Sequence, residues 1–322
     1  MGSFVLTRLL RAIPLFLGLS LVVFALIHAA PGGPLTVYLS NPNVSVEDIE
    51  RLERSLGLDR PLHVQYFSWL TAFVRGDWGY SYVDGRAVLD RVLERAPATL
   101  ELMGTAFVLA LVVALVLGSL AALNSDSVLD RLVSTSSIVG ISVPTFWLGL
   151  VLQLVFAVQL RWFPTAGRAS PVGGERLTYL VLPVLTLGSF YAASWVRYVR
   201  ASLSDTLERD FVRAGRSRGV PEPRLLLRHV LPNALFPLIT VLALDFALLF
   251  SGAVVTETVF SWPGMGSLLV DSVYRRDYSV LMAILMTGSV LIVVSNLLAD
   301  VAYGLLDPRV RLARHPTSGG AA

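Results

Sequence analysis

Few side chains in this sequence could do chemistry, and the missing residue types exclude several kinds of site. The chain has 322 residues with no cysteine and no lysine, so all 26 basic residues are arginine. A Walker A phosphate loop and a Schiff base each need a lysine, and a thiol nucleophile needs a cysteine. The four histidines form no HExxH motif. The GxSxG match at 215–219 lies at the end of a predicted helix and not between a strand and a helix, so it is no nucleophile elbow. We therefore expect neither an enzyme nor a metal or cofactor site.

One carboxylate stands out because apolar residues surround it. Asp245 lies near the middle of the apolar run 233–256. A charged side chain at that depth costs about 3 kcal/mol on insertion scales and normally faces a bundle interior or a watery cavity. Asp245 is therefore a candidate wall residue of a pathway, where its charge could attract a cationic group. The alternative is a hydrogen bond to a neighbouring span, for instance to Gln153.

The second candidate is an arginine-rich segment, residues 203–237, set between two apolar runs. Residues 210–218 can make about two and a half helical turns, and Gly219 followed by Pro221 is a stop signal. A second short helix is predicted over 222–231, with Leu225, Leu226 and His229 on one side, and Pro232 opens the next apolar run. Such a hairpin, held at both ends by membrane spans, can pass a push from a partner into the bilayer. Its charge alone is typical of any cytoplasmic loop.

The composition predicts an all-α integral membrane protein. Apolar residues make up 54% of the chain and charged residues 15%, against about 45–50% and 25% in soluble proteins. Six apolar runs come close to the roughly 20 residues that cross a bilayer: they are 12–30, 100–123, 133–160, 177–196, 233–256 and 280–299. The first run is longer than the about 7–15 residues of a signal-peptide core, so we expect a retained span. Orientation in the membrane explains the high pI better than nucleic-acid binding does.

The longest polar segment, residues 31–97, lies between the first two spans. Its pattern predicts three short helices, one after a capping box of Ser45 and Asp48, one over 61–75 and one over 86–95. We expect a folded cap on the membrane, which is either a plain lid or a seat for an outside partner. The predicted domains are then a first span (1–30), the cap (31–97), a five-span core (98–306) that contains the hairpin 203–232, and a tail (307–322).

The arginines predict which side of the membrane each segment occupies. Six spans put both termini on the same side as the hairpin. That side carries fourteen arginines against five, once segment 31–97 is set aside, because loops above about 60 residues follow the rule poorly. The termini and the hairpin are therefore expected in the cytoplasm and the cap outside.

The hairpin resembles the cytoplasmic signature of the membrane subunits of binding-protein-dependent ABC importers. That signature is Glu-Ala-Ala, three residues, Gly, nine residues and Ile-x-Leu-Pro. Its places are taken here, with the spacing kept, by Arg213, Ala214, Gly215, Gly219, His229, Leu231 and Pro232. The departures are Arg213 for Glu, Gly215 for Ala and His229 for Ile. No carboxylate therefore stands at the first place of the signature, while the predicted helix, turn and helix are kept.

Other stretches resemble the dipeptide and oligopeptide permeases, and the cap resembles the B-type subunit of that group. They are 31–32, 56–61, 65–66, 256–266, 276–278 and 300–309. The resemblance implies a passage for di- or oligopeptides, or for a nickel chelate or a sugar, in a bacterial or archaeal plasma membrane. It also implies a second related permease, two cytoplasmic ATPases and an extracytoplasmic substrate-binding protein as partners. An ion-coupled secondary transporter is the rival, but Asp245 alone is a thin basis for ion coupling.

Overall fold

The computed structural model describes residues 2–29, 45, 47, 51, 53–54, 57–168 and 176–306. Within these ranges the regular structure is helical, apart from an isolated antiparallel bridge between Tyr80 and Ala87. The helices are α1 (Gly2–Ala29), α4 (Leu62–Val74), α5 (Val88–Leu123), α6 (Val128–Ser142), α7 (Thr145–Leu152), the π-helical η1 (Gln153–Gln159), α8 (Arg176–Leu207), α9 (Asp210–Ser217), α10 (Glu222–Leu225), the π-helical η2 (Leu226–Val230), α11 (Leu231–Val259), α12 (Met265–Tyr274) and α13 (Tyr278–Leu306). The all-α prediction is confirmed.

Four of the described helices are long and apolar enough to cross a membrane. They are α5, α8, the continuous helix Glu222–Val259 and α13. A fifth span results if α6 and α7–η1 are counted together, although this pair is bent by 100°. In α1 the described apolar stretch, Ile13–Ala29, is shorter than these. A multi-pass membrane protein is therefore confirmed, whereas the count of six spans stays a prediction.

The predicted third span, 133–160, is not one straight helix. Val143 and Pro144 have extended backbone angles, with ψ of 122° and 131°, between α6 and α7. The residue before a proline is pushed out of the helical conformation because the proline ring crowds its backbone. The sharp bend therefore follows from Pro144.

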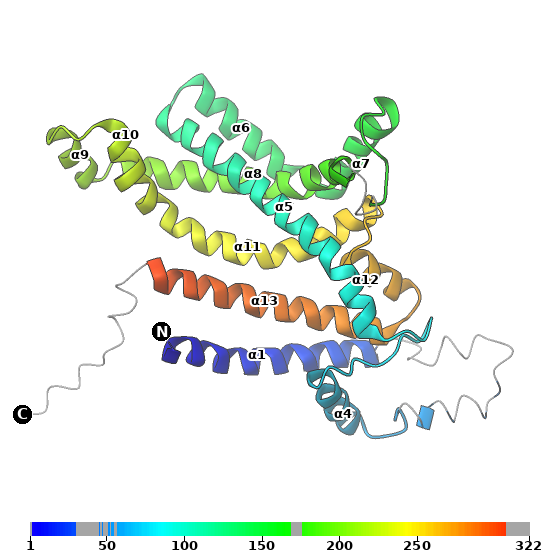
Figure 1. Ribbon diagram of the computed structural model, residues 1–322. Helices are drawn as coiled ribbons and strands as arrows, with labels where there is room; N and C mark the ends of the chain where they lie inside the picture. Colours follow the sequence, from blue (N-terminus) through cyan, green and yellow to red (C-terminus); the bar gives the residue numbers. More distant parts are fainter. Residues whose placement is uncertain are drawn as a thin grey trace, which may run out of the picture.

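The connections between the long helices lie at the two ends of the bundle (Figure 1). The start of α1, the α9–α10 hairpin and the end of α13 lie at one end, on the left of the view. At the other end lie α4, α7 and α12. The hairpin thus shares a side with the start of the first helix and the end of the last, as an even number of crossings would require.

The core is built on a stripe of small residues along α5. Ala106, Ala110, Ala114 and Gly118 recur every fourth residue and are all buried. This stripe lets α8 approach closely, and a Cβ on Gly118 would lie 2.7 Å from the Cβ of Val199. Small residues at this spacing are a common way to pack membrane helices. As a result α8, which leads directly into the hairpin, is fixed against α5.

Helix α4 of the cap packs on the end of α1 and the start of α13 through aromatic residues. Tyr66 and Phe73 of α4 join one buried cluster with Phe24 of α1 and Tyr278 of α13. The hydroxyl groups of Ser20 and Tyr66 lie 2.8 Å apart and hydrogen-bond α1 to α4. Aromatic rings with a polar end commonly lie at such a boundary. The described helix α4 of the cap is therefore packed onto α1 and α13.

The three predicted cap helices fared differently. The second is confirmed as α4. The third is wrong as a separate short helix, because α5 runs unbroken from Val88 through Pro97. Val88 and Val92 pack in a buried cluster with Leu268 of α12 and Ile284 of α13, which extends α5 beyond the apolar run. Most of the first helix, with Asp48, lies outside the described residues, as do segment 31–32 and the tail 307–322.

Candidate functional site

The first helix of the hairpin ends in a Schellman motif. Gly219 has φ +73° and donates its N–H to the carbonyl of Arg216 at 3.0 Å, while Val220 donates to the carbonyl of Gly215 at 3.1 Å. These two bonds satisfy carbonyl groups that the end of a helix leaves free, and the left-handed backbone at the turn favours glycine. The predicted stop at Gly219 is therefore confirmed, and its mechanism is visible.

A small apolar core holds the two hairpin helices together. Val212 of α9, Leu225 of α10 and Val230 of η2 are buried there with Leu203 of α8. Gly215 makes the contact close, because a Cβ at that position would lie 2.7 Å from Cδ1 of Leu225. The core joins α9 and α10 to the end of α8, so the hairpin and α8 form a packed unit.

One ion pair ties the two hairpin helices on their outer surface. Arg216 of α9 donates from Nη2 to Oε1 of Glu222 at 2.7 Å, and its Nε donates to the same oxygen at 3.0 Å. Both side chains are about half exposed. An exposed pair of this kind contributes about 0–1 kcal/mol. The apolar core therefore contributes most of the stability of the hairpin, and the ion pair helps to fix the angle between its two helices.

The second hairpin helix does not end where the sequence predicted. It begins at Glu222 as expected but continues through η2 into α11, so Pro232 does not open a new element. The π turn gives the helix a bond from the N–H of Leu231 to the carbonyl of Leu226, just before the proline that has no N–H. The Asn233 side chain donates to the carbonyl of His229 at 2.6 Å. These bonds carry the helix past Pro232.

The same π turn changes which side chains face the core. His229 was predicted on the side of Leu225 and Leu226, but it is exposed, while Leu225 is buried. In a π turn the residues that face the same side are more than four positions apart. Val230, five positions after Leu225, is therefore the next buried residue. The remaining signature residues lie on the hairpin surface: Arg213, Ala214, Gly219 and Pro232 are exposed, and Gly215 and Leu231 are half-buried.

Asp245 does not lie with the hairpin residues, and its hydrogen-bond partner differs from the one suggested. The indole Nε1 of Trp195 in α8 donates to Oδ2 of Asp245 at 2.6 Å. Gln153 instead donates to the carbonyl of Thr165. The Trp195 ring is buried between Phe107 and Tyr191, at centroid distances of 5.1 and 5.8 Å. Asp245 itself is half-buried.

A buried ion pair beside the hairpin was missed by the sequence reasoning. Asp130 of α6 is almost fully buried and binds the guanidinium of Arg200 in α8, with one contact, Nη2 to Oδ2, of 2.7 Å. The Ser127 hydroxyl caps α6 by accepting from the N–H of Asp130 at 3.2 Å. Two residues after Arg200, the Ser202 hydroxyl donates to the carbonyl of Ala234 in α11 at 2.6 Å. The spacing of Ser127 and Asp130 is a capping-box signal that could have located the start of α6.

At the opposite end, an acidic residue anchors a cap loop. Asp277, which is buried, accepts from the Ser81 hydroxyl at 2.5 Å, from the N–H of Tyr82 at 3.2 Å and from Arg91 Nη1 at 3.2 Å. These bonds join the cap loop to the short connection between α12 and α13. The stretch 276–278 noted in the sequence thus has a structural role.

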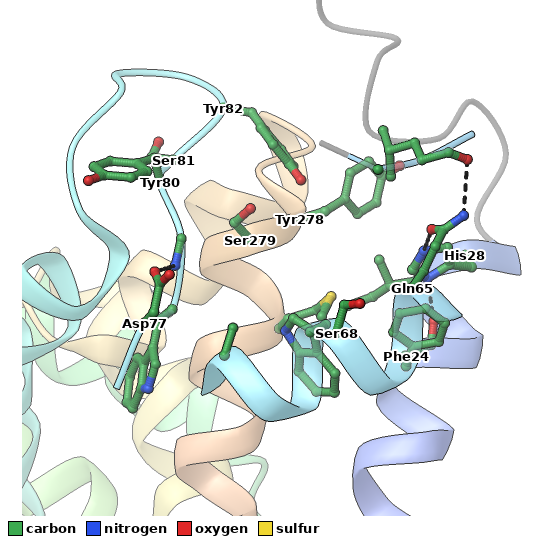
Figure 2. Close-up of a pocket in the computed structure, with 18 of the residues that line it drawn as sticks. Phe24, His28, Gln65, Ser68, Asp77, Tyr80, Ser81, Tyr82, Tyr278 and Ser279 are labelled. Atoms are coloured by element: carbon green, nitrogen blue, oxygen red, sulfur yellow. Dashed lines mark hydrogen bonds between the residues drawn. The ribbon is translucent and has the colours of Figure 1, made fainter. Parts of the chain in front are cut away.

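Beside this loop lies a cavity of about 720 Å³ between α1, α4, the turn 77–82 and the start of α13. Figure 2 shows His28 and Gln65 on one side of it and Asp77 and Tyr80 on the other. His28 and Gln65 are hydrogen-bonded to each other, Nε2 to Oε1, at 3.3 Å. Apolar and aromatic side chains, among them Trp69, line much of the rest.

Comparisons with known proteins agree with this geometry. Residues 114–312 match the family model described as a binding-protein-dependent transport system inner membrane component, and residues 1–103 match the N-terminal model of such membrane components. The chain is 39% identical over 316 residues to the oligopeptide transport system permease protein AppB of Bacillus subtilis (strain 168), covering 96% of this chain and 99% of that protein.

Two further comparisons concern a second relative and a solved structure. The chain is 39% identical over 311 residues to the glutathione transport system permease protein GsiC of Escherichia coli (strain K12), covering 97% of this chain and 99% of that protein. The fold is similar to a chain of the inward-facing MetNI methionine ABC transporter, with a TM-score of 0.56, 17% identity and coverage of 67% of this chain and 96% of that one. The chain therefore belongs to the family of binding-protein-dependent transport system inner membrane components and is a permease subunit of an ABC importer.

Proposed function

We propose that this chain forms half of the translocation pathway of an ATP-driven importer of di- or oligopeptides, and that its hairpin receives the push of cytoplasmic ATPases. The observation that carries the proposal is the hairpin itself, which is closed by the Schellman turn at Gly219 and packed through Val212 and Leu225. The substrate class is supported by the two relatives, which are named for oligopeptide and glutathione transport.

The contacts of the hairpin suggest how the push reaches the other end of the bundle. The second hairpin helix is continuous with α11 as far as Val259, and α8 leads into the first. Asp130–Arg200 ties α8 to α6, and Ser202 ties it to α11. A movement of the hairpin therefore displaces α8 and α11 together, because rigid packed helices move as units. Both helices end near α12 and α7 (Figure 1), so the displacement opens or closes the far end.

The assembly proposed contains one copy of this chain, a second related permease, two cytoplasmic ATPases and an extracytoplasmic substrate-binding protein. The hairpin and both termini then lie in the cytoplasm, and the cap faces outward, in a bacterial or archaeal plasma membrane whose lipid surrounds the bundle. The division into a first span, a cap, a core and a tail is retained as part of the proposal. Its bounds are those predicted from the sequence: 1–30, 31–97, 98–306 and 307–322.

ATP hydrolysis tests the division of labour between the subunits. The chain contains no lysine for a phosphate loop. We expect the chain purified alone in detergent to show no ATP turnover, whereas the complex with its ATPases hydrolyses ATP and does so faster when the loaded binding protein is added. The control is the complex with the Walker A lysine of each ATPase replaced, which removes any contaminating activity from the comparison. Clear turnover by the isolated chain would overturn the assignment.

We also propose that Asp245 lies on the wall of the pathway and attracts the protonated amino end of a peptide. Asp245→Asn removes the charge but keeps an oxygen that accepts from Trp195 Nε1, so the fold is retained. Uptake of zwitterionic peptides is expected to fall severalfold, measured in proteoliposomes together with the melting temperature of the variant. Unchanged uptake at equal stability would leave Asp245 with a structural role, as the acceptor of the Trp195 hydrogen bond.

A further inference from the structure

At the end of the bundle opposite the hairpin, a carboxylate is fully buried. Glu257, in the last turns of α11, accepts from the Thr99 hydroxyl at 2.6 Å through Oε1 and from the N–H of Ser267 at 2.9 Å through Oε2. A buried charge is retained only where hydrogen bonds replace the water that it has lost. The carboxylate therefore depends on groups from two other helices, α5 and α12.

The Thr99 hydroxyl joins all three helices. It donates its hydrogen to Glu257, so its oxygen is free to accept, and the N–H of Met265 donates to it at 2.7 Å. Met265 and Ser267 belong to the first turn of α12, where backbone N–H groups have no partner within the helix. Thr99 and Glu257 supply these partners. The start of α12 is thus held by one side chain of α5 and one of α11.

Two glycines leave space for this network, and one tryptophan fixes the turn to α5. A Cβ on Gly264 would lie 2.2 Å from Oε1 of Glu257, and a Cβ on Gly266 would lie 2.5 Å from the Cα of Val254. The indole of Trp262 is buried, and its Nε1 donates to the carbonyl of Ala98 in α5 at 2.9 Å. The spacing of these residues in the stretch 256–266 is therefore the spacing that a turn folded around a buried carboxylate requires.

The same part of α5 also holds the connection that precedes α8. Glu101, one turn from Ala98, pairs with Arg168 at 2.6 Å, and the Arg168 guanidinium lies 5.5 Å from the centre of the Trp262 ring. The N–H of Gly167 donates to the carbonyl of Phe260 at 2.9 Å. Residues 98–101 of α5 therefore bind both neighbouring connections. Separating α11 from α5 would take the Thr99 hydrogen bond from the buried Glu257 carboxylate, and separating α11 from α12 would take the Ser267 one; either loss is unfavourable because the carboxylate has no water to replace it.

We propose that Glu257 and Thr99 are positioning residues, which lock α12 to α5 and α11 so that the outer ends of these three helices move as one body during transport. α12 is then no independent lid, and the passage opens between this body and the other permease. This inference rests on the proposed importer function for its transport arm. The lock itself is a property of the isolated chain, so the two can fail separately.

Hydrogen exchange and coupling efficiency test the lock with three variants of the full chain. Thr99→Val removes both hydrogen bonds at nearly constant volume, Thr99→Ser keeps the hydroxyl, and Thr105→Val removes a hydroxyl that bonds only within α5. In Thr99→Val we expect the amides of residues 265–267 to exchange at least tenfold faster than in the wild type. In the assembled importer we expect more ATP to be hydrolysed per peptide imported. Thr99→Ser and Thr105→Val should match the wild type in both measurements.

A second variant keeps the test valid if Thr99→Val does not fold. Glu257→Gln can still accept from the N–H of Ser267 but presents an amide to Thr99, so a smaller rise in the same two quantities is expected. The proposal is overturned if the amides of α12 remain as protected as in the wild type. It is also overturned if they exchange faster while the ratio of ATP to peptide stays constant, because the lock would then be structural only. Loss of transport by the wild type with normal protection would count against the importer function and not against the lock.

Discussion

Replacing Gly219 by proline is expected to abolish ATP-driven uptake while the amount of membrane-inserted chain stays normal. Gly219 adopts φ +73°, whereas a proline ring fixes φ near −65°. Proline also removes the N–H that bonds to the carbonyl of Arg216. The Schellman turn therefore cannot form, and α9 loses its orientation on α10 at the surface that we assign to the ATPases. Uptake into proteoliposomes and quantification of the inserted chain measure the two effects.

Three other hairpin variants separate this effect from a general disturbance. Gly219→Asn should retain most of the uptake, because asparagine tolerates the left-handed conformation and no atom lies within 4 Å of the position of its Cβ. Leu231→Asp should uncouple transport, because half-buried Leu231 packs against the hairpin core and a carboxylate is unfavourable against apolar side chains. Arg213→Ala should have a small effect, since the Arg213 side chain is 71% exposed. Normal uptake by Gly219→Pro at normal expression would contradict a coupling role for the hairpin.

Replacing Asp130 by alanine is expected to destabilise the helix bundle beside the hairpin. The substitution leaves the Arg200 guanidinium without its acceptor and removes the hydrogen bond to the N–H of Asp126. Breaking a buried pair by removing one partner costs about 3–5 kcal/mol. The lower end of that range applies here, because the Arg200 side chain is 34% exposed. The measurement is the melting temperature of the detergent-solubilised chain, which should fall by several degrees.

The matched control is an exposed ion pair at the end of α8, the helix that carries Arg200. Asp205 and Arg209 form an exposed pair at 2.9 Å, with side chains 71% and 59% exposed. Such a pair is worth about 0–1 kcal/mol, so Asp205→Ala should leave the melting temperature almost unchanged. Equal effects of Asp130→Ala and Asp205→Ala would show that the pair of Asp130 and Arg200 is not the tie between α6 and α8 that the coupling route needs.

The parts of this fold that sequence reasoning predicted are those whose causes are local. The stop at Gly219 is set by the residues of one turn, and it was placed correctly. The helix over 62–74 follows from an apolar pattern with Gly76 close behind it, and it was also found. The hairpin signature has fixed spacing within one segment. Each of these features depends on one short stretch of the chain, the longest being the signature 213–232, and a sequence pattern can supply that information.

Three errors concern the effect of a proline: Pro97 and Pro232 were read as boundaries, and Pro144 was placed inside a span. The helices pass through Pro97 and Pro232 because packing and a π turn compensate for the missing N–H, as membrane helices commonly allow. At Pro144 the chain does bend, by 100°. The sequence around the three prolines gave no sign of this difference, because it depends on what each helix packs against.

The long-range polar pairs could not be predicted for a different reason. Thr99 and Glu257 are 158 residues apart, and Ser81 and Asp277 are 196 apart. Trp195, the partner of Asp245, is 50 residues away and was read as an apolar residue of a span. A single sequence states which groups need partners, but the pairing follows from how the helices are arranged. The departure at Gly215 illustrates this: its lack of a side chain has a reason only beside Leu225.

The central claim, that this chain carries peptides as one half of a binding-protein-dependent importer, is tested most directly by uptake into proteoliposomes. The chain, its partner permease and the two ATPases are reconstituted with ATP on the ATPase side, and the binding protein loaded with a radiolabelled tripeptide is added on the other. We predict that labelled peptide accumulates only when all components and ATP are present, and that omission of this chain or of the binding protein stops it. Accumulation by the chain without ATPases or ATP, driven by an ion gradient, would contradict the account.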